Sequence, residues 1–253
     1  MAPVGTIRDE AVCIRHWDWS ETSQTVSLFT REHGVLRGLA KGSKREKTDF
    51  SGGLEILTRG EVLALTKPTR ALATLTAWEL RETFPQCRSD LVRHYAGVYA
   101  IDLVHHAILE GDPHPNLYDD LVSCLRGLGE PESAADPAVQ TLRFQWSVLT
   151  EIGQAPQLTQ DSQTGKPLAR VDVFGFNPQT GGVTADPGPG IASVWRVRAE
   201  TIELLGSLGG AQGIAPSQSP AVLRANSLLA AYLRERLEVE PHSMQPLLDC
   251  LDR

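Results

Sequence analysis

Six positively charged side chains lie close together in a short stretch of the first third of the chain. They are the clearest candidates in the sequence for binding a ligand. They are Arg31, Arg37, Lys41, Lys44, Arg45 and Lys47. Only Glu32 and Glu46 oppose them between residues 31 and 47, so the local balance is +4. Guanidinium and ammonium groups contact the phosphates of nucleic acids, which predicts a phosphate-binding surface here. A solvated, charged hairpin has the same composition, so this alternative stays open.

Aromatic side chains near these cations would add a second kind of contact. Proteins that bind single strands combine a cationic groove with aromatic platforms on which bases stack. The candidate platforms are Trp17, Trp19 and Phe50. We find no base-reading motif, so we expect binding that tolerates any sequence and depends strongly on salt.

The net charge of the whole chain argues against nucleic-acid binding, but this charge is unevenly distributed along the sequence. The 253 residues carry a formal charge of −7, whereas phosphate binding needs a cationic surface. Residues 1–81 hold 12 lysines and arginines against 10 acids, and residues 82–253 hold 12 against 21, which gives +2 and −9. We therefore expect weaker and more salt-sensitive binding than in a uniformly basic protein, with the acidic part as a scaffold or protein-binding surface.

Other reactive residue types do not assemble into a catalytic or metal-binding pattern. His105 and His106 are adjacent and face different directions on a helix, and we interpret them, like His94 and His114, as ordinary histidines. We interpret Asp102 as a satisfied buried acid that packs a helix against the first part of the chain. The sequence has no P-loop and no G-x-S-x-G motif, so we predict a protein without enzymatic activity.

The elements that must position these residues change character along the chain. Alternating apolar residues predict five strands within residues 8–80, the third over 35–41 and the fourth over 54–66 with a possible bend at Gly60. Five short strands favour a small closed barrel, of OB type or, as the competitor, SH3-like. Helical periodicity then predicts helices over 89–110, 116–126, 137–152, 194–205, 220–237 and 243–251.

The first part of the chain also resembles a known family in the order of its short motifs. They are Ala11-Val12-Cys13-Ile14, Trp19-Ser20-Glu21-Thr22-Ser23, Leu28-Phe29-Thr30-Arg31-Glu32-His33-Gly34, Ala40-Lys41-Gly42 and Gly52-Gly53-Leu54-Glu55-Ile56-Leu57. In this order they resemble the start of the bacterial recombination mediator family RecO. Weaker likenesses, such as Gly153-Gln154-Ala155-Pro156-Gln157-Leu158, extend over most of the chain.

The sequence departs from that family where many members carry four zinc-binding cysteines. Asp161 and Thr164 stand near the first expected pair, and Ala185 and Gly188 near the second. One carboxylate does not make a tetrahedral zinc site. We therefore expect no metal and no cofactor, and a loop or hairpin held by its own packing. The four cysteines that the chain does have are far apart, and we expect reduced, mostly buried thiols.

The resemblance implies an α+β protein with a five-stranded OB-type barrel followed by an all-helical domain with an irregular, zinc-less insertion. The expected parts are 1–82 (DNA-binding barrel), 83–152 (first helical part), 153–190 (zinc-finger-like segment) and 191–253 (second helical part). With no signal peptide or membrane helix in view, we expect a cytoplasmic protein that makes no membrane contact.

The resemblance also implies a function. Family members bind single- and double-stranded DNA, anneal complementary strands, and work with RecR and the single-stranded-DNA-binding protein in loading a recombinase. Arg37, Lys41, Lys44, Arg45 and Lys47 would contact phosphates, with Arg31 a lesser candidate. The acidic, apolar tail of the single-stranded-DNA-binding protein would need an apolar groove with a cation, which we expect in the helical part. The alternative is an OB-fold adaptor that binds RNA or protein only.

Overall fold

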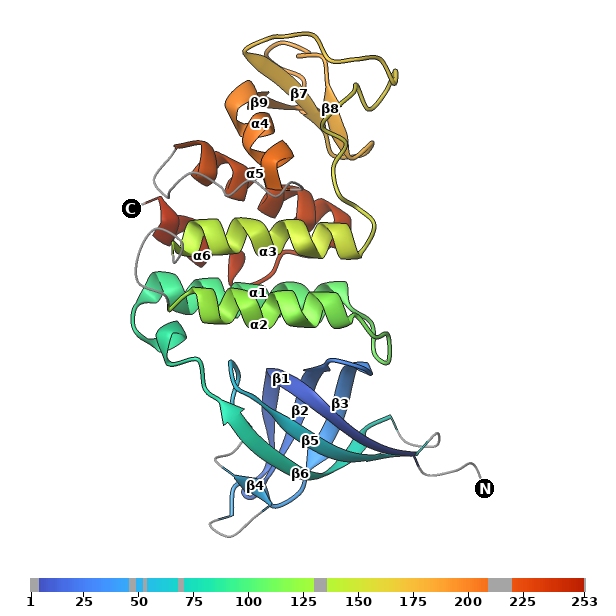
Figure 1. Cartoon of the computed structure of the whole chain (residues 1–253), viewed down its shortest axis with the longest axis vertical. Coiled ribbons are helices and arrows are strands. Elements are labelled where there is room, and N and C mark those ends of the chain that lie inside the picture. Colours follow the sequence, from blue (N-terminus) through green and yellow to red (C-terminus); the bar gives the residue numbers. More distant parts are fainter. Residues whose placement is uncertain are drawn as a thin grey trace. The chain divides into compact units, whose positions relative to one another are not determined.

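The computed structural model describes residues 5–45, 49–51, 54–67, 71–129, 136–208 and 220–252. The chain divides into two compact units, Met1–Gly129 and Glu130–Arg253. The first unit holds a β-sheet followed by helices, and the second holds helices and a small sheet (Figure 1). The predicted α+β class is confirmed.

The sheet of the first unit closes on itself. Its strands are β1 (Gly5–Ser20), β2 (Ser23–Thr30), β3 (Gly34–Ala40), β4 (Phe50–Ser51), β5 (Arg59–Thr66) and β6 (Ala73–Glu82). They lie in the order β3-β2-β1-β5-β6-β4, and β3 also pairs in parallel with β6. The five longer strands therefore form a ring, as an OB-type fold requires.

The long first strand makes this closure possible. Its first half, from Gly5 to Val12, pairs with β5, and its second half, from Ala11 to Ser20, pairs with β2. The β1–β2 register shifts between Cys13 and Arg15, and such a bulge bends a strand and increases its twist. One strand thereby serves both walls of the ring.

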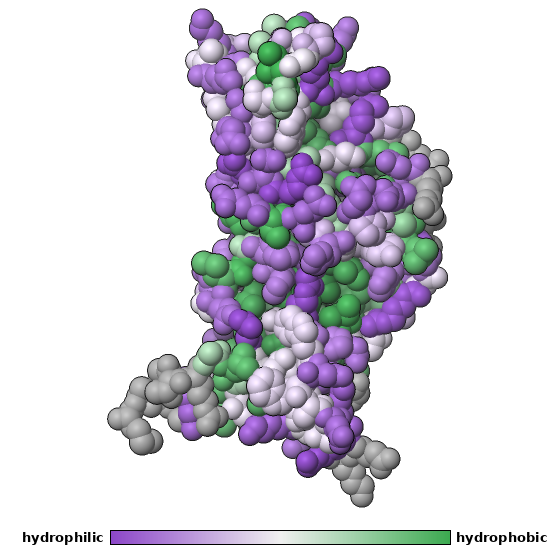
Figure 2. All heavy atoms as spheres, turned by 180° about the vertical axis from the view of Figure 1, so that it is seen from behind, coloured by the Kyte–Doolittle hydropathy of each residue, from purple (hydrophilic) through white to green (hydrophobic). Residues whose placement is uncertain are grey.

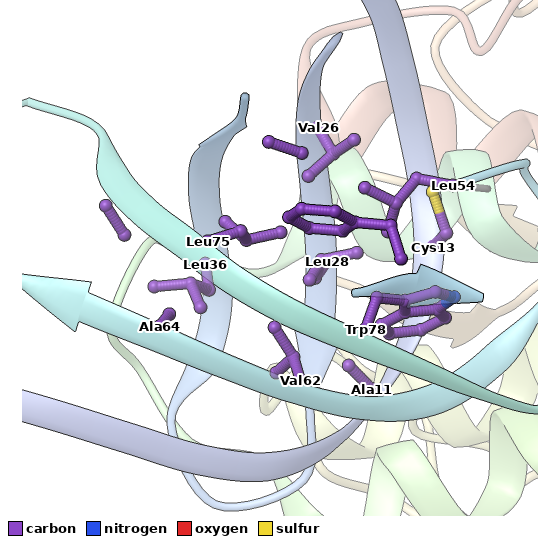
Figure 3. Close-up of a cluster of buried hydrophobic side chains, with 13 residues drawn as sticks. Ala11, Cys13, Val26, Leu28, Leu36, Leu54, Val62, Ala64, Leu75 and Trp78 are labelled. Atoms are coloured by element: carbon purple, nitrogen blue, oxygen red, sulfur yellow. The ribbon is translucent and has the colours of Figure 1, made fainter. Parts of the chain in front are cut away.

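Apolar side chains from all the long strands fill the interior (Figure 3). Trp78 of β6 is fully buried and belongs to this cluster together with Ala11 and Cys13 of β1. Val26 and Leu28 enter it from β2, two residues apart, as the period of a strand requires. The intervening residues of β2 consequently face outward.

The fourth predicted strand is wrong in its first residues. The structure begins β5 at Arg59, and Leu54 and Leu57 instead lie in a turn with buried side chains. Leu57 has a φ of 56°, which no strand residue adopts. The bend expected at Gly60 is present as a register shift between Arg59 and Gly60 in the pairing with β6.

A short helix and two α-helices complete the first unit: η1 (Pro85–Arg88), α1 (Leu91–Ala107) and α2 (Pro115–Gly127). Asp90 caps α1, because its side chain accepts a 2.9 Å hydrogen bond from the Arg93 amide. Buried Asp102 of α1 accepts a hydrogen bond from Arg15 of β1. Asp102 thus joins helix and sheet, as predicted.

The second unit consists of α3 (Pro137–Glu151), β7 (Val173–Asn177), β8 (Gly182–Thr184), β9 (Trp195–Arg198), α4 (Ala199–Leu208), α5 (Pro220–Leu237) and α6 (Met244–Leu251). The helix predicted over 194–205 is wrong in its first part, because β9 pairs with β7 and the helix begins only at Ala199. Phe176 of β7 contacts the ring of Tyr232 on α5, with centroids 5.2 Å apart. This contact packs the small sheet onto the helices.

The surface is mixed in character. Hydrophilic side chains cover most of the face shown in Figure 2, and hydrophobic ones lie in separate groups among them. Within the described ranges, no helix is both long enough and apolar enough to cross a lipid bilayer.

Candidate nucleic-acid interface

The turn that follows β3 is fixed to the end of the β1–β2 hairpin. Ser43 is buried and donates a 3.1 Å hydrogen bond to the side chain of Gln24. The Lys44 amide donates to the carbonyl of Thr22 at 3.2 Å, and the Gly42 amide donates to the Ser23 hydroxyl at 3.1 Å. Gly42 has a φ of 71°, which glycine adopts without strain. The cations of this turn are therefore carried by an anchored segment.

The six predicted cations fall into three groups. Lys41 and Arg45 are exposed, and no carboxylate among the described residues pairs with either. Arg31, Arg37 and Lys44 each have an acidic partner. Lys47 lies outside the described residues.

Two of the paired cations, Arg31 and Arg37, differ in how firmly they are held. Arg31 makes two hydrogen bonds, at 3.0 and 2.8 Å, to Asp119 of α2, so its charge is committed to the helix. Arg37 makes one 3.1 Å contact to Glu110, with both side chains about half exposed. Such exposed single pairs contribute little, so Arg37 can exchange its partner for a phosphate at low cost.

The register expected for Arg37 and Lys41 is only partly correct. Residues four apart on a strand over 35–41 would face the same side, but β3 ends at Ala40 and Lys41 is the first residue of the turn. Arg37 does face outward, opposite Ser27 of β2. The two cations therefore sit on different elements.

Two of the three predicted aromatic platforms are on the surface. Trp17 and Trp19 are 47% and 64% exposed, near the end of β1. With Arg37 they line a hollow of about 230 Å³ on the outer face of β1–β3. Phe50 is wrong as a platform: it is 4% exposed, because β4 pairs with β6 beside Trp78 and directs the ring into the barrel core.

Part of this outer face lies beneath α1. His105 is half-buried there, and its pKa is lowered to about 4 by burial first, and then by the charges of Arg15, His106 and Arg37. The imidazole is therefore neutral at pH 7 and adds no charge to the surface. Cys13 and Cys124 are buried free thiols whose pKa is raised by burial, as expected for inert thiols.

A second candidate site is an apolar groove in the second unit. Trp195, Val197, Leu223 and Leu228 line it, from β9 and α5, and its volume is about 460 Å³. Arginines from the same elements surround these apolar side chains. Arg196 pairs with Asp186 at 2.8 Å and Arg224 with Glu200 at 2.8 Å, and Asp252 also lines the groove.

One cation of this groove is not neutralised. Arg198 is exposed, and no carboxylate in the described parts of the chain pairs with it. The sequence did not reveal this site, because β9, α4 and α5 meet there only in the fold. The sequence feature that could have pointed to this groove is the alternation of apolar residues and arginines over residues 195–198.

The segment that replaces the expected zinc module is organised around one carboxylate. Oδ1 of Asp161 accepts hydrogen bonds from the amides of Gln163 and Thr164 at 3.0 and 2.7 Å and from the Thr164 hydroxyl at 2.9 Å. Oδ2 accepts from the Thr184 hydroxyl at 2.8 Å and the Ala185 amide at 3.2 Å. These bonds hold the pKa of Asp161 well below its usual value.

Asp161 thus links the two places where the resemblance leads one to look for cysteine pairs. The residues present do not suit zinc, since the described residues include no cluster of three or more His, Cys, Asp or Glu side chains that could hold a metal ion. Along the same path, β7 and β8 form a hairpin, one of the two forms, loop or hairpin, that the sequence predicts for this segment.

The barrel and its outer surface define a class of protein, that of OB-type barrels joined to a helical unit. A family model described as "Recombination protein O N terminal" matches residues 1–84, and one described as "Recombination protein O C terminal" matches residues 88–245. The chain belongs to the RecO family of DNA repair proteins.

Several relatives carry the name "DNA repair protein RecO". The one from Salinibacter ruber is 30% identical over 241 residues, which are 94% of this chain and 91% of that protein. The one from Anaeromyxobacter dehalogenans is 28% identical over 89% of each chain. The one from Rhodopirellula baltica is 31% identical over 160 residues, which span only 58% of that protein.

Proposed function

We propose that this protein binds single- and double-stranded DNA on the outer face of β1–β3, anneals complementary strands, and assists recombinase loading together with RecR and the single-stranded-DNA-binding protein. The observation that carries the proposal is the pair of exposed cations, Lys41 and Arg45, on an anchored turn next to exposed tryptophans. Membership of a DNA repair family gives this surface its context.

The charges suit backbone binding that tolerates any sequence. Lys41 and Arg45 can contact phosphates without breaking an ion pair within the described chain, and Arg37 and Lys44 can join by giving up exposed partners. Each phosphate contact releases counterions, so affinity falls steeply with salt. Annealing needs two backbones brought together with their bases free, and neutralisation by such a surface serves the first requirement.

The groove of β9, α4 and α5 suits the protein partner. A tail that is both acidic and apolar needs an apolar trough and a cation, and Trp195, Val197 and Arg198 offer both. We propose that the tail of the single-stranded-DNA-binding protein lies in this groove, with an acidic group on Arg198. The aromatic and arginine lining is of the kind that dominates binding energy at interfaces.

The experiment that tests the function follows the annealing of two complementary oligonucleotides by the purified protein over a salt series, with and without RecR. Annealing should be faster with the protein than without it, and the acceleration should fall as salt rises. An annealing rate equal to the spontaneous rate at low salt would overturn the annealing part of the proposal. Binding to RNA or protein alone would identify the chain as an adaptor.

A further inference from the structure

Two tryptophans at the end of β1 are more exposed than large apolar side chains usually are. Trp78 of the same barrel is fully buried, whereas Trp17 and Trp19 leave about half or more of their surface in water. Exposing an indole forgoes the burial free energy that other tryptophans gain. We therefore expect a binding partner to cover the two exposed indoles.

The strand geometry explains why both rings reach one hollow. Trp17 pairs with Thr25, which pairs in turn with Leu39, so the three form a row across β1, β2 and β3 on the side opposite to the core residue Val26. Trp19 lies in the register shift between Asp18 and Ser20. Bulges commonly redirect a side chain, and both indoles line the same hollow.

One arginine borders this hollow, and a lysine pairs with the residue between the two tryptophans. Arg37 lines it directly. Lys44 reaches Asp18, the residue between the two tryptophans, with its ammonium 2.6 Å from the carboxylate. A ligand with a flat apolar part beside an anionic group is complementary to the two indoles and Arg37, and a nucleotide within a single strand has both features.

The size of the hollow restricts what it can hold. About 230 Å³ is below the 300–1,000 Å³ range of ordinary small-molecule sites, so the hollow suits one planar group rather than a whole cofactor. Bases of a single strand can splay out and stack on aromatic rings, whereas bases in a duplex offer no free face.

We propose that Trp17 and Trp19 form a stacking subsite for one unpaired base, with Arg37 at the adjoining phosphate. This inference rests on the proposed DNA binding and deepens it, because it gives single strands a contact that duplexes lack. A single strand therefore gains affinity here that the annealed product loses. Product release after annealing follows from that difference.

The test compares oligothymidylate with a duplex of the same length on four proteins: the full-length wild type, Trp17→Ala/Trp19→Ala, Trp17→Phe/Trp19→Phe, and Leu63→Ala. Leu63 is an exposed apolar residue of β5 outside the hollow and serves as the matched control. The alanine variant should lose roughly 5- to 150-fold in affinity for oligothymidylate, the loss of one stacked base. Its duplex affinity and its salt slope should stay at wild-type values, since no cation has been removed.

The phenylalanine variant should keep most of the affinity, because its rings still stack, while losing the quenching of tryptophan fluorescence that oligothymidylate causes in the wild type. This measurement decides the question even where the alanine variant does not fold. Equal losses on both forms of DNA, unchanged affinity in the alanine variant, or no quenching in the wild type would each overturn the subsite. An unaffected alanine variant would point to a protein partner on the tryptophans.

A failure of the subsite is distinguishable from a failure of the proposed function. If Lys41→Ala/Arg45→Ala weakens both forms of DNA while the tryptophan variants behave as wild type, DNA binding stands and the subsite is wrong. If the wild type binds neither form at low salt, the proposed function itself is wrong.

Discussion

The Lys44 ammonium lies 2.6 Å from the Asp18 carboxylate, and this ion pair joins the turn after β3 to the strand that carries the two exposed tryptophans. The pair neutralises one of the cations that the sequence predicted to contact DNA. Both partners are partly exposed, so the pair contributes little to stability. Its main effect is to lower the positive charge with which the surface can attract a phosphate.

Replacing Asp18 by Asn should therefore strengthen DNA binding. The amide keeps the shape of the side chain, removes a negative charge from the surface and frees Lys44 for a phosphate. The slope of log affinity against log salt should steepen by about 0.7 for single strands and about 0.9 for duplex. Glu61→Gln, which breaks the exposed Arg8 pair on another part of the barrel, is the matched control and should change neither quantity. Unchanged binding in the Asp18 variant would remove Lys44 from the interface.

Replacing Asp102 by Ala should destabilise the first unit. Asp102 is 3% exposed and holds Arg15, which is itself largely buried, so the variant leaves a buried guanidinium without its carboxylate. Breaking a buried pair on one side costs roughly 3–5 kcal/mol. Urea unfolding of the full chain measures the loss, with exposed Asp120→Ala as the control. A loss no larger than that of the control would show that the pair does not hold α1 to β1.

The hydrogen bonds to Asp161 make the second unit sensitive to acid. Because its folded-state pKa lies below the ordinary value of about 3.9, the stabilisation is present above that pH and is lost as the pH falls through the folded-state value. Asp161→Asn should lower the melting temperature at pH 7, since an amide nitrogen cannot accept hydrogen bonds from Thr184 and Ala185. It should also flatten the acid limb of the stability profile.

Thermal unfolding of the full chain between neutral and acid pH follows both effects. Asp172→Asn, at an exposed acid of the same unit, is the control. Added zinc should not restore the variant. An Asp161 variant as stable as the wild type at pH 7, or a stoichiometric zinc content in the purified wild type, would contradict the interpretation of this segment.

The groove of the second unit should bind an acidic, apolar peptide through Arg198. Arg198→Ala should weaken a synthetic peptide of acidic and apolar residues by about tenfold, the effect of one hydrogen-bonded charge at about 1.5 kcal/mol. Fluorescence anisotropy of the labelled peptide measures this loss. Arg143→Ala, at an exposed arginine of α3 outside the groove, should leave the peptide affinity unchanged. Equal effects of the two variants would place the peptide elsewhere.

Local sequence patterns predict much of the secondary structure of the first unit. The strand-forming residues of β2 and the long helix predicted over 89–110, which is α1, each depend on one local segment, and the structure confirms both elements. The charges of the turn after β3 were visible because they are adjacent in sequence. The partners of Arg31 and Arg37 were not visible, because Asp119 and Glu110 approach them only in the folded chain.

The errors have the same origin. Trp195–Arg198 directly precedes the residues of α4 and also suits a helix, and its pairing with β7 makes it a strand. The sequence does not distinguish Phe50 from a surface aromatic, because its two-residue strand is too short to show an alternation. The Asp161 network and the Arg198 groove join segments separated in sequence, so local patterns did not locate either of them.

The central claim, that the surface around the turn after β3 binds DNA through Lys41 and Arg45, is tested most directly by the salt dependence of DNA affinity in Lys41→Ala/Arg45→Ala. Arg8→Ala is the control, since Arg8 is an exposed barrel arginine paired with Glu61. Two lost phosphate contacts should reduce the slope of log affinity against log salt by about 1.4 for single strands and about 1.8 for duplex, with weaker binding at low salt. A double variant with the affinity and slope of the wild type would contradict the claim.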